Sequence, residues 1–469
     1  MRDTTLSDGA ETDRGAELAA SLLQRVFQHL SFGFPVRLCN GPTFAVGARN
    51  AAAMDSRFLL RFVSAEAVGS LILGKDPLRL AEAYFRSDVD IEGDLFAALR
   101  LKDHLDELRL STWERLSAWF MAHELRSLSR HLPREMGHDV SQPAPWGHLG
   151  TRPSHGGVVR GHSKDENRDA VHFHYDVSNE FYRLWLGPSM VYSCAYFEEA
   201  NYSLDEAQQA KLEHICRKLM LRPGEQFLDI GCGWGSLVIH AARHYGVKAY
   251  GITLSEKQLQ FAQRRIAQEG LEQQVTVELK DYRDLQGSEV YDKVASIGMF
   301  EHVGLKNLPL YFDTVHRLLK PSGLFLNHGI THARPGWDEN VSTTFINRYV
   351  FPDGELDNIS NIQRCMEDAK FEIADVEALR DHYARTLRAW VLQLERRRAR
   401  ALEYVSESIY RVWRLYMAAS AVEFESGHIG VYQVLASRRG PLHAKLPLTR
   451  RHLYCQPVAG NQLVERLAP

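Results

Sequence analysis

The sequence predicts an α/β protein, in which a doubly wound parallel sheet follows a smaller N-terminal α+β domain. The chain has 469 residues, which is more than a single hydrophobic core usually serves. Before about residue 135, helical patterns and short strand-like runs are mixed, and from about residue 169 strand-length apolar runs alternate with helix-length amphipathic segments. Such alternation is typical of a parallel sheet covered by helices on both faces. We therefore expect two domains, each with its own core.

The N-terminal domain is expected to span residues 16–135. A polar stretch at 1–15, predicted to be disordered, precedes the helical pattern GAELAASLLQRVFQHL and the strand-like runs PVRLCN and RFLLRFV. Two further helical patterns follow, LRLAEAYFRS and the stretch from about Leu95 to Leu132. Residues 136–168, which include QPAPWGHLGTRPSHGG, are rich in proline, glycine and histidine, and we predict that they form a linker.

The second domain is expected to span residues 169–437, before a C-terminal tail at 438–469. Its successive strands are predicted in the runs QFLDIG, KAYGITL, VTVELKD, DKVASIG and GLFLNHGI. Three segments between them, SLVIHAARHYG, EKQLQFAQRRIAQEG and LYFDTVHRLLKPSG, have helical periodicity. Because ligands of such sheets bind at the carboxyl ends of the strands, we expect the functional residues at those ends and in the loops that follow.

Composition and charge argue against several classes of protein. The formal net charge of -3 gives no general basis for binding nucleic acid. The six cysteines have neither a CxxC pair nor a zinc-like spacing, so we expect free thiols, a reducing compartment and no metal site. No apolar stretch approaches the length of a membrane span or resembles a signal peptide. We therefore expect a cytoplasmic protein that contacts a membrane only at its surface.

A glycine-rich loop follows the first strand of the second domain, in the run Phe227–Gly235 with the sequence FLDIGCGWG. Such glycines let a ligand approach the backbone, and the helix that follows offers unpaired N–H groups. The spacing is GxGxG, and no acidic residue ends the next strand at Gly251–Leu254, which disfavours a dinucleotide site. LDIGCGWG resembles the first motif of Rossmann-like methyltransferases, which implies contacts of Gly231 and Gly233 with S-adenosylmethionine. By itself the loop would also fit an ordinary tight turn, but the later runs DYRD and LKPSG favour the cofactor site.

Further motifs extend this resemblance over residues from about 165 to 437. In chain order they are MVYSCAYFEE (190–199), GITLSEKQ (251–258), SIGMFEHVG (296–304), NHGI (327–330), YVFPDGEL (349–356), DHYARTLRAW (381–390) and finally FESGHIGVYQVLAS. Together they resemble the cyclopropane-fatty-acyl-phospholipid synthase family, which includes the mycolic acid cyclopropane synthases. The resemblance implies a Rossmann-like class I methyltransferase fold. It also implies an S-adenosylmethionine-dependent methyltransferase of lipid biosynthesis that makes a cyclopropane fatty acid.

The resemblance assigns residues to the cofactor site. Those implied to line it are Tyr192, Ser193, Gly231, Gly233, Thr253, Leu254, Gln258, Tyr282 and Arg283. In this family Thr253, Leu254 and Gln258 seat the ribose, which explains why no acidic residue ends the second strand. Taken alone, Thr253 and Gln258 would equally fit a helix cap and a solvated helix face.

Adding a one-carbon unit to a double bond makes two chemical demands. An isolated alkene is a poor nucleophile, so a sulfonium methyl group must be held in line with it at close range. Methyl transfer then leaves a carbocation, and a ring forms only if a base removes a proton from the added methyl group before water attacks. The site therefore has to be dry, aromatic and equipped with a base.

In the resembling family the base is a bound bicarbonate ion. The residues implied to hold it are Cys194, Glu301, His328, the backbone of Ile330, and Tyr383. Glu301 would accept the bicarbonate hydroxyl proton, while His328 and Tyr383 donate hydrogen bonds. Taken singly, Cys194 would fit a buried apolar site and His328 a core imidazole. Tyr175 and Phe351 match aromatic residues that stabilise the cation, at about 2 kcal/mol or more each when desolvated, although both would also fit core packing.

The N-terminal domain resembles the extra, lipid-interacting domain of the longer bacterial-type synthases, most clearly in LGKDPLRLAEAYFRSDVDIEGDLFAAL. This resemblance favours unsaturated phospholipid acyl chains as the substrate and peripheral contact with a membrane. Arginines gathered between Arg385 and Arg400, with Arg438 and Arg450 in the tail, would either meet lipid phosphates or form a solvated helix face. The oligomeric state stays open, a homodimer included.

Two positions depart from the family pattern, and two other functions stay open. Gly329 stands where better-known members often carry threonine, and Asp357 where they often have proline; both bear on the product and the acyl-chain preference. One alternative is an enzyme that adds a methyl or methylene branch to a fatty acyl chain, but the sequence shows no second dinucleotide motif for a hydride source. The other is a catalytically inactive lipid- or cofactor-binding protein, which would not need a base.

Overall fold

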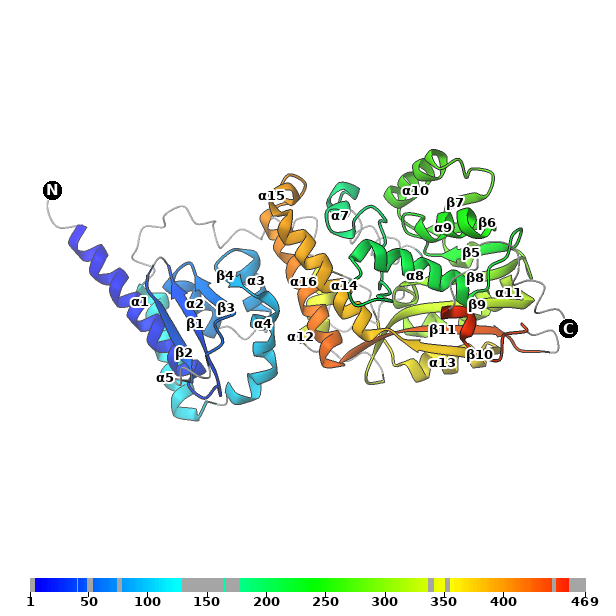
Figure 1. Cartoon of the computed structure of the whole chain (residues 1–469). Coiled ribbons are helices and arrows are strands. Elements are labelled where there is room, and N and C mark those ends of the chain that lie inside the picture. Colours follow the sequence, from blue (N-terminus) through cyan, green and yellow to red (C-terminus); the bar gives the residue numbers. More distant parts are fainter. Residues whose placement is uncertain are drawn as a thin grey trace. The chain divides into compact units, whose positions relative to one another are not determined.

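The computed structural model describes residues 5–39, 41–48, 54–73, 78–108, 110–128, 164, 177–335, 341–350, 355–440 and 444–454. The chain divides into two compact units, each assembled from three segments (Figure 1). Unit 1 comprises residues 1–158, 338–352 and 390–423, and unit 2 comprises residues 159–337, 353–389 and 424–469. Apart from residue 164, the predicted linker at 136–168 lies outside the described residues. Within the described part of the chain, no helix is long and apolar enough to cross a bilayer.

Unit 1 is built on a four-stranded sheet in the order β2-β1-β3-β4. Its strands are β1 Gly33–Leu38, β2 Thr43–Gly47, β3 Phe58–Phe62 and β4 Val89–Gly93. β1 pairs antiparallel with β2 and parallel with β3, and β3 pairs antiparallel with β4. The helices of this N-terminal part are α1 Thr5–Phe27, α2 Ala65–Leu73, α3 Arg79–Phe85, α4 Leu95–Leu99, the 3-10 helix η2 Arg100–Leu108, and α5 Thr112–Leu128. The first helix thus begins earlier than the apolar periodicity predicts.

The core of unit 1 lies between this sheet and helices α1, α2 and α5. Along β3, the buried side chains of Phe58, Leu60 and Phe62 alternate with partly exposed ones, as expected of a strand with one face on a core. Helices α2 and α5 approach closely at Gly69, where an added Cβ would lie 3.0 Å from the carbonyl oxygen of Ala122. A small residue at this crossing therefore allows the two helices to pack.

Later segments of the chain add further helices to unit 1. They are α12 Val341–Tyr349, the C-terminal part of α14 Arg380–Arg396, α15 Arg398–Ala401 and most of α16 Glu407–Ser426. The sequence places these residues within the predicted 169–437 domain. In the structure, those from 390 to 423 group with the N-terminal segment.

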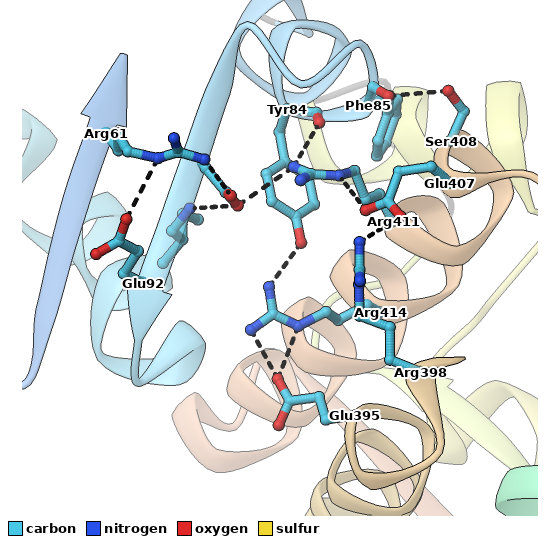
Figure 2. A network of polar contacts seen from close by, with 12 residues as sticks. Arg61, Tyr84, Phe85, Glu92, Glu395, Arg398, Glu407, Ser408, Arg411 and Arg414 are labelled. Carbon is cyan, nitrogen blue, oxygen red and sulfur yellow. Dashed lines mark hydrogen bonds and ion pairs between the residues drawn. The ribbon is translucent and has the colours of Figure 1, made fainter. Parts of the chain in front are cut away.

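Two arginines of α16 hold these helices to the N-terminal part of unit 1 (Figure 2). The Arg411 guanidinium donates to the Tyr84 carbonyl oxygen at 3.1 Å and to Asp90 Oδ1 at 3.3 Å. Arg414 donates to the Tyr84 hydroxyl oxygen at 2.6 Å and to Glu395 Oε1 at 2.7 Å. Because the Arg411 side chain is only 9% exposed, loss of its partners would leave a buried charge uncompensated, which is strongly destabilising.

Unit 2 contains a seven-stranded sheet in the order β10-β11-β9-β8-β5-β6-β7. Its strands are β5 Gln226–Ile230, β6 Lys248–Thr253, β7 Val275–Leu279, β8 Tyr291–Ile297, β9 Leu319–His332, β10 Phe371–Ala378 and β11 Ile429–Arg438. The strands from β5 to β9 pair in parallel, whereas β11 pairs antiparallel with β9 and β10. All five strands predicted from the sequence are present, and the predicted doubly wound sheet is confirmed.

Helices cover both faces of this sheet (Figure 1). They are α7 Asn179–Leu186, α8 Leu204–Lys218, α9 Ser236–Tyr245, α10 Glu256–Gln268, α11 Leu308–Leu318, α13 Ile359–Asp368, the N-terminal part of α14, and α17 Arg451–Tyr454. Helices α8, α9 and α10 share one hydrophobic core with the sheet, and α11 and α13 share the other. Along β9, Leu324 and Leu326 belong to the first core and Phe325 to the second. Since side chains alternate along a strand, His328 continues the first row and Gly329 the second.

Gly329 leaves space for the ring of Phe300. Phe300 lies in the 3-10 helix η4 Phe300–His302, after β8, and its side chain is buried in the second core. A Cβ on Gly329 would lie 2.0 Å from Phe300 Cε1, far inside van der Waals contact. The threonine often found at this position in the family would therefore require the ring to move. The departure from the family pattern thus follows from local packing.

We predict that Gly329→Ala lowers the free energy of unfolding by about 1 to 3 kcal/mol, the usual cost of overpacking a core. Urea denaturation of the full chain measures this loss. Gly430→Ala on the neighbouring strand β11 is the matched control, because its Cβ would meet Tyr432 Cε2 at 3.0 Å and so needs a smaller adjustment. Adding Phe300→Leu should restore part of the stability, and a Gly329→Ala protein as stable as the wild type would contradict the packing argument.

Candidate active site

A cavity opens at the carboxyl ends of four neighbouring strands of unit 2, β5 to β8. Backbone segments at 190–193, 229–234, 252–254, 280–282 and 297–299 line it, together with side chains from α8, α9 and α10. β5 lies between β6 and β8, and the order of the strands along the chain reverses there. The cavity is therefore at the topological switch point, where doubly wound sheets bind their ligands.

The glycine loop forms the floor of this cavity. Gly231 and Gly233 have φ angles of +85° and +55°, in the left-handed region that favours glycine. The loop is tied to β6, since the N–H groups of Gly231 and Cys232 donate to the Ile252 carbonyl oxygen at 3.0 and 2.9 Å. A Cβ added at Gly233 would meet no atom within 4 Å. The space above Gly233 is thus open to a ligand.

The structure brings together eight of the nine residues predicted to bind the cofactor. Those lining the cavity are Tyr192, Ser193, Gly231, Gly233, Thr253, Leu254, Gln258 and Tyr282. Thr253 and Gln258 also bond to each other, with the Thr253 hydroxyl donating to Gln258 Oε1 at 2.7 Å. Arg283 is not among the described residues that line the cavity, and its guanidinium forms an ion pair with Asp281 at 2.6 Å.

Lys211 of α8 and Asp229 of β5 are among the buried charged residues at the cavity that were not singled out from the sequence. Lys211 Nζ donates to Ser193 Oγ at 3.0 Å, while Asp229 Oδ1 has no hydrogen-bond partner among the described residues. Burial raises the pKa of Asp229 to about 7 despite the opposing charge of Lys211, and burial lowers the pKa of Lys211 to about 8. An ammonium and a carboxyl group that face one cavity match the two charged groups of an amino acid, such as the methionine end of S-adenosylmethionine.

Glu301 connects the segment after β8 to β9. Its side chain is buried, and its Oε1 accepts a hydrogen bond from the Ile330 N–H at 2.8 Å. The ladder between β8 and β9 ends at the pair of Ile297 and His328. Beyond that pair, the Ile330 N–H has no partner on β8, and the Glu301 carboxylate accepts its hydrogen bond instead. Burial raises the pKa of Glu301 to about 7, although the bond from Ile330 opposes this shift.

Cys194 lies beside the start of α14, which carries Tyr383. The Cys194 thiol is fully buried and donates to the carbonyl oxygens of Ala195 at 3.3 Å and Leu379 at 3.7 Å. The Leu379 carbonyl also accepts from the Tyr383 N–H at 3.1 Å, and the Leu379 N–H donates to Val431 of β11 at 2.9 Å. Val431 pairs directly with Ile330. The predicted anion ligands thus lie on adjoining elements, although they do not themselves line the cavity.

His328 is held neutral and in one orientation. Burial lowers its pKa to about 3, and the positive charges of Lys211 and Lys218 act in the same direction. Gln433, its direct partner on β11, places its amide nitrogen 3.2 Å from His328 Nδ1. Because an amide N–H can only donate, we infer that Nδ1 accepts and that the imidazole hydrogen is on Nε2. Both His328 Nε2 and Glu301 Oε2 are buried without a hydrogen-bond partner among the described residues.

Two predicted sets remain to be placed. Tyr175 and Phe351, predicted to stabilise the cation, lie outside the described residues.

Several of the clustered arginines are engaged in ion pairs: Arg398 with Glu407 at 2.6 Å and Arg438 with Glu289 at 2.9 Å. These charges are partly neutralised before any lipid is met.

The model of the family described as mycolic acid cyclopropane synthetase matches residues 162–434. The chain belongs to this family. A relative from Pseudomonas putida named "Probable fatty acid methyltransferase" is 47% identical over 63% of this chain and 76% of its own length. The Escherichia coli "Cyclopropane-fatty-acyl-phospholipid synthase" is 42% identical over 56% of this chain and 66% of its own length. A Mycobacterium tuberculosis relative named "Probable fatty acid methyltransferase Rv3720" is 39% identical over 78% of this chain and 83% of its own.

Solved structures of the family share the fold of more than half of this chain. The mycolic acid cyclopropane synthase CmaA1, in a complex with SAH and CTAB, is 34% identical with a TM-score of 0.55 over 57% of this chain and 97% of its own. The cyclopropane synthase MmaA2 from Mycobacterium tuberculosis is 32% identical with a TM-score of 0.54 over 57% of this chain and 97% of its own. The predicted Rossmann-like methyltransferase fold and the predicted class, an S-adenosylmethionine-dependent enzyme of this family, are confirmed.

We predict that Gly233→Val abolishes binding of S-adenosylmethionine, because the added side chain occupies the open space above the glycine loop. Calorimetry should show an affinity at least tenfold lower, a loss of about 1.4 kcal/mol or more. Gly270→Val is the matched control: Gly270 also has a positive φ, +66°, and open space at its Cβ, so it carries the same backbone strain away from the cavity. Unchanged affinity in the Gly233 variant would exclude the loop as the cofactor site.

The tautomer of His328 gives a second prediction. In protein labelled with 15N at histidine, NMR should show the His328 hydrogen on Nε2. Gln433→Glu should move it to Nδ1, because a carboxylate accepts where the amide donates. The signal is assigned by its loss in His328→Gln, and the affinity for S-adenosylmethionine, measured in parallel, should not change. A wild-type His328 that carries its hydrogen on Nδ1 would contradict the assignment.

Proposed function

We propose that this enzyme transfers a methylene group from S-adenosylmethionine to the double bond of an unsaturated phospholipid acyl chain, forming a cyclopropane fatty acid, with bound bicarbonate as the general base. The observation that carries the proposal is the pair of buried, unsatisfied polar atoms on adjoining elements, Glu301 Oε2 and His328 Nε2. Buried polar atoms in native proteins nearly always have partners. Because these two atoms lie on elements next to the cofactor cavity, they support the binding of a small polar ligand there.

The chemistry of these atoms fits bicarbonate. That ion carries one hydroxyl donor and two acceptor oxygens. His328 offers a donor, because Gln433 fixes the hydrogen on Nε2. Glu301 offers an acceptor through the oxygen that Ile330 leaves unused. A neutral imidazole and an ionised carboxylate would thus orient the anion through one donated and one accepted hydrogen bond.

When bound, S-adenosylmethionine supplies the electrophilic methyl group and bicarbonate supplies the base. The residues of the chain position and protect these groups. Glu301 accepts the hydroxyl hydrogen only while it is ionised, and its pKa of about 7 means that this form is lost as the pH falls through that value. Burial of Cys194, Glu301 and His328 keeps water away from a cation that water would otherwise capture.

Phospholipid as the substrate is supported by one of the relatives. The Escherichia coli relative is named "Cyclopropane-fatty-acyl-phospholipid synthase". We place the reaction on the cytoplasmic side, with the protein peripherally associated with the membrane.

Methyl branching is the second candidate. The relatives named "Probable fatty acid methyltransferase" favour it, and it would use the same cofactor cavity. A ring forms when the methylated cation loses a proton from the added methyl group to a base, whereas a saturated methyl branch forms only when the cation gains a hydride from a reductant. The sequence shows no second dinucleotide motif for such a hydride source, and an intact Glu301 and His328 pair favours the ring. A catalytically inactive binding protein would not need that pair.

Mass spectrometry of lipids from cells that express the protein tests this function. We expect acyl chains that have gained one CH2 and resist hydrogenation, which identifies a ring. Glu301→Gln should lower turnover by about 10² to 10⁴, the usual worth of a positioned base, with little change in cofactor affinity. Glu289→Gln, which alters an exposed carboxylate, is the control. Saturated, branched products from the wild type, or normal turnover of the Glu301 variant, would contradict the proposed reaction.

A further inference from the structure

Helix α5 of unit 1 exposes an unusually apolar face. Trp113, Leu116, Trp119 and Phe120 are 82%, 53%, 48% and 58% exposed. Trp113, Leu116 and Phe120 follow the i, i+3, i+7 spacing that places side chains on one side of a helix. The opposite side of α5 carries Ala118, Ala122 and Leu125, which are buried in the core of unit 1. Among the described residues, the apolar face therefore takes no part in the core of unit 1.

Two rings of this face, those of Trp119 and Phe120, contact each other. Trp119 stacks on His123 with ring centroids 4.3 Å apart and meets Phe120 edge to face at 5.2 Å. Among the described tryptophans, Trp113 and Trp119 are the exposed pair, whereas Trp185, Trp234, Trp390 and Trp413 are buried. Rings that are already ordered lose little conformational freedom when they meet a surface.

The charges near this face leave it suited to lipid. The two glutamates of α5 are turned to neighbouring groups. Glu114 accepts from Gln28 at 2.6 Å, and Glu124 forms an ion pair with Arg14 of α1 at 2.7 Å. The exposed Arg115 lies beside the face, where its cation matches lipid phosphates. Glu124 lies one turn after Phe120 on this side of the helix, and its charge is balanced by Arg14. Tryptophan and phenylalanine on a helix face with a basic residue beside it are typical of helices that lie in a membrane interface.

The size of the face argues against a second protein chain as its partner. A fully exposed aromatic side chain offers roughly 150 to 250 Å², so the four residues at their exposed fractions present about 500 Å². A stable protein interface buries about 800 Å² on each partner. Shallow insertion into a bilayer has no such minimum, because the membrane surrounds each side chain.

We propose that the face formed by Trp113, Leu116, Trp119 and Phe120 is the surface through which the enzyme docks on a phospholipid bilayer. The proposal rests on the proposed function in one respect, namely that the substrate lies in a membrane. The face would hold the protein at the bilayer by burying four apolar side chains at the level of the headgroups. The affinity of the protein for vesicles should therefore depend little on salt, unlike an affinity that depends on arginine clusters.

The test compares the full chain with Trp113→Ser/Phe120→Ser in cosedimentation with vesicles of unsaturated phosphatidylglycerol and phosphatidylethanolamine. The double variant should bind at least about tenfold more weakly, at low and at high salt, while its affinity for S-adenosylmethionine stays unchanged. Leu80→Ser is the matched control, because Leu80 of α3 is also apolar and 55% exposed. Brominated lipids should quench wild-type fluorescence more than that of Trp113→Ser.

Vesicle binding of the double variant equal to that of the wild type would overturn the proposal. So would a variant that loses self-association in sedimentation velocity but keeps vesicle binding, since the face would then serve a second copy of the chain. A wild type that binds vesicles through this face yet leaves their lipids unmodified would refute the proposed reaction and leave the docking surface standing. If the double variant binds vesicles normally and still modifies their lipids, the docking surface is refuted and the proposed reaction stands.

Discussion

The hydrogen bond from the Ile330 N–H to Glu301 is the interaction on which the site depends. β8 ends at Ile297, so the next donor of β9 would be buried without a partner, at a cost of about 1 to 3 kcal/mol. The carboxylate of Glu301 removes that cost by using one of its oxygens at 2.8 Å. The same contact fixes η4, packs Phe300 over Gly329, and leaves the second carboxylate oxygen for chemistry. Strand pairing and the proposed base chemistry therefore share one side chain.

Much of unit 2 could be predicted from the sequence, because its signals are local. Apolar runs of strand length marked all five parallel strands, and the glycine loop marked the end of β5. The cofactor residues followed from a resemblance that rests on contiguous motifs. Arg283 was placed with them by the same resemblance, but its guanidinium turns to Asp281, a neighbour two residues away that the motif does not constrain.

The remaining features depend on contacts between distant residues, so no local pattern reveals them. Lys211 sits in a largely polar helix and resembles a solvated side chain, although its spacing from Gln208, Leu212 and Ile215 places it on the buried stripe. Gln433 meets His328 only because of the register between β9 and β11. Residues 390–423 join unit 1 through ion pairs such as that of Arg411 with Asp90, which are invisible to periodicity.

The three-part construction of unit 1 has a consequence for how the protein is made. Asp90 and Arg411 are 321 residues apart in the chain, and ribosomes add about 5 to 20 residues per second. The N-terminal part of unit 1 therefore leaves the ribosome roughly 15 to 60 seconds before helix α16, which carries Arg411. During that interval Asp90 has Arg61 of β3 as an ion-pair partner but lacks Arg411. Unit 1 can therefore be completed only after most of the chain has been synthesised.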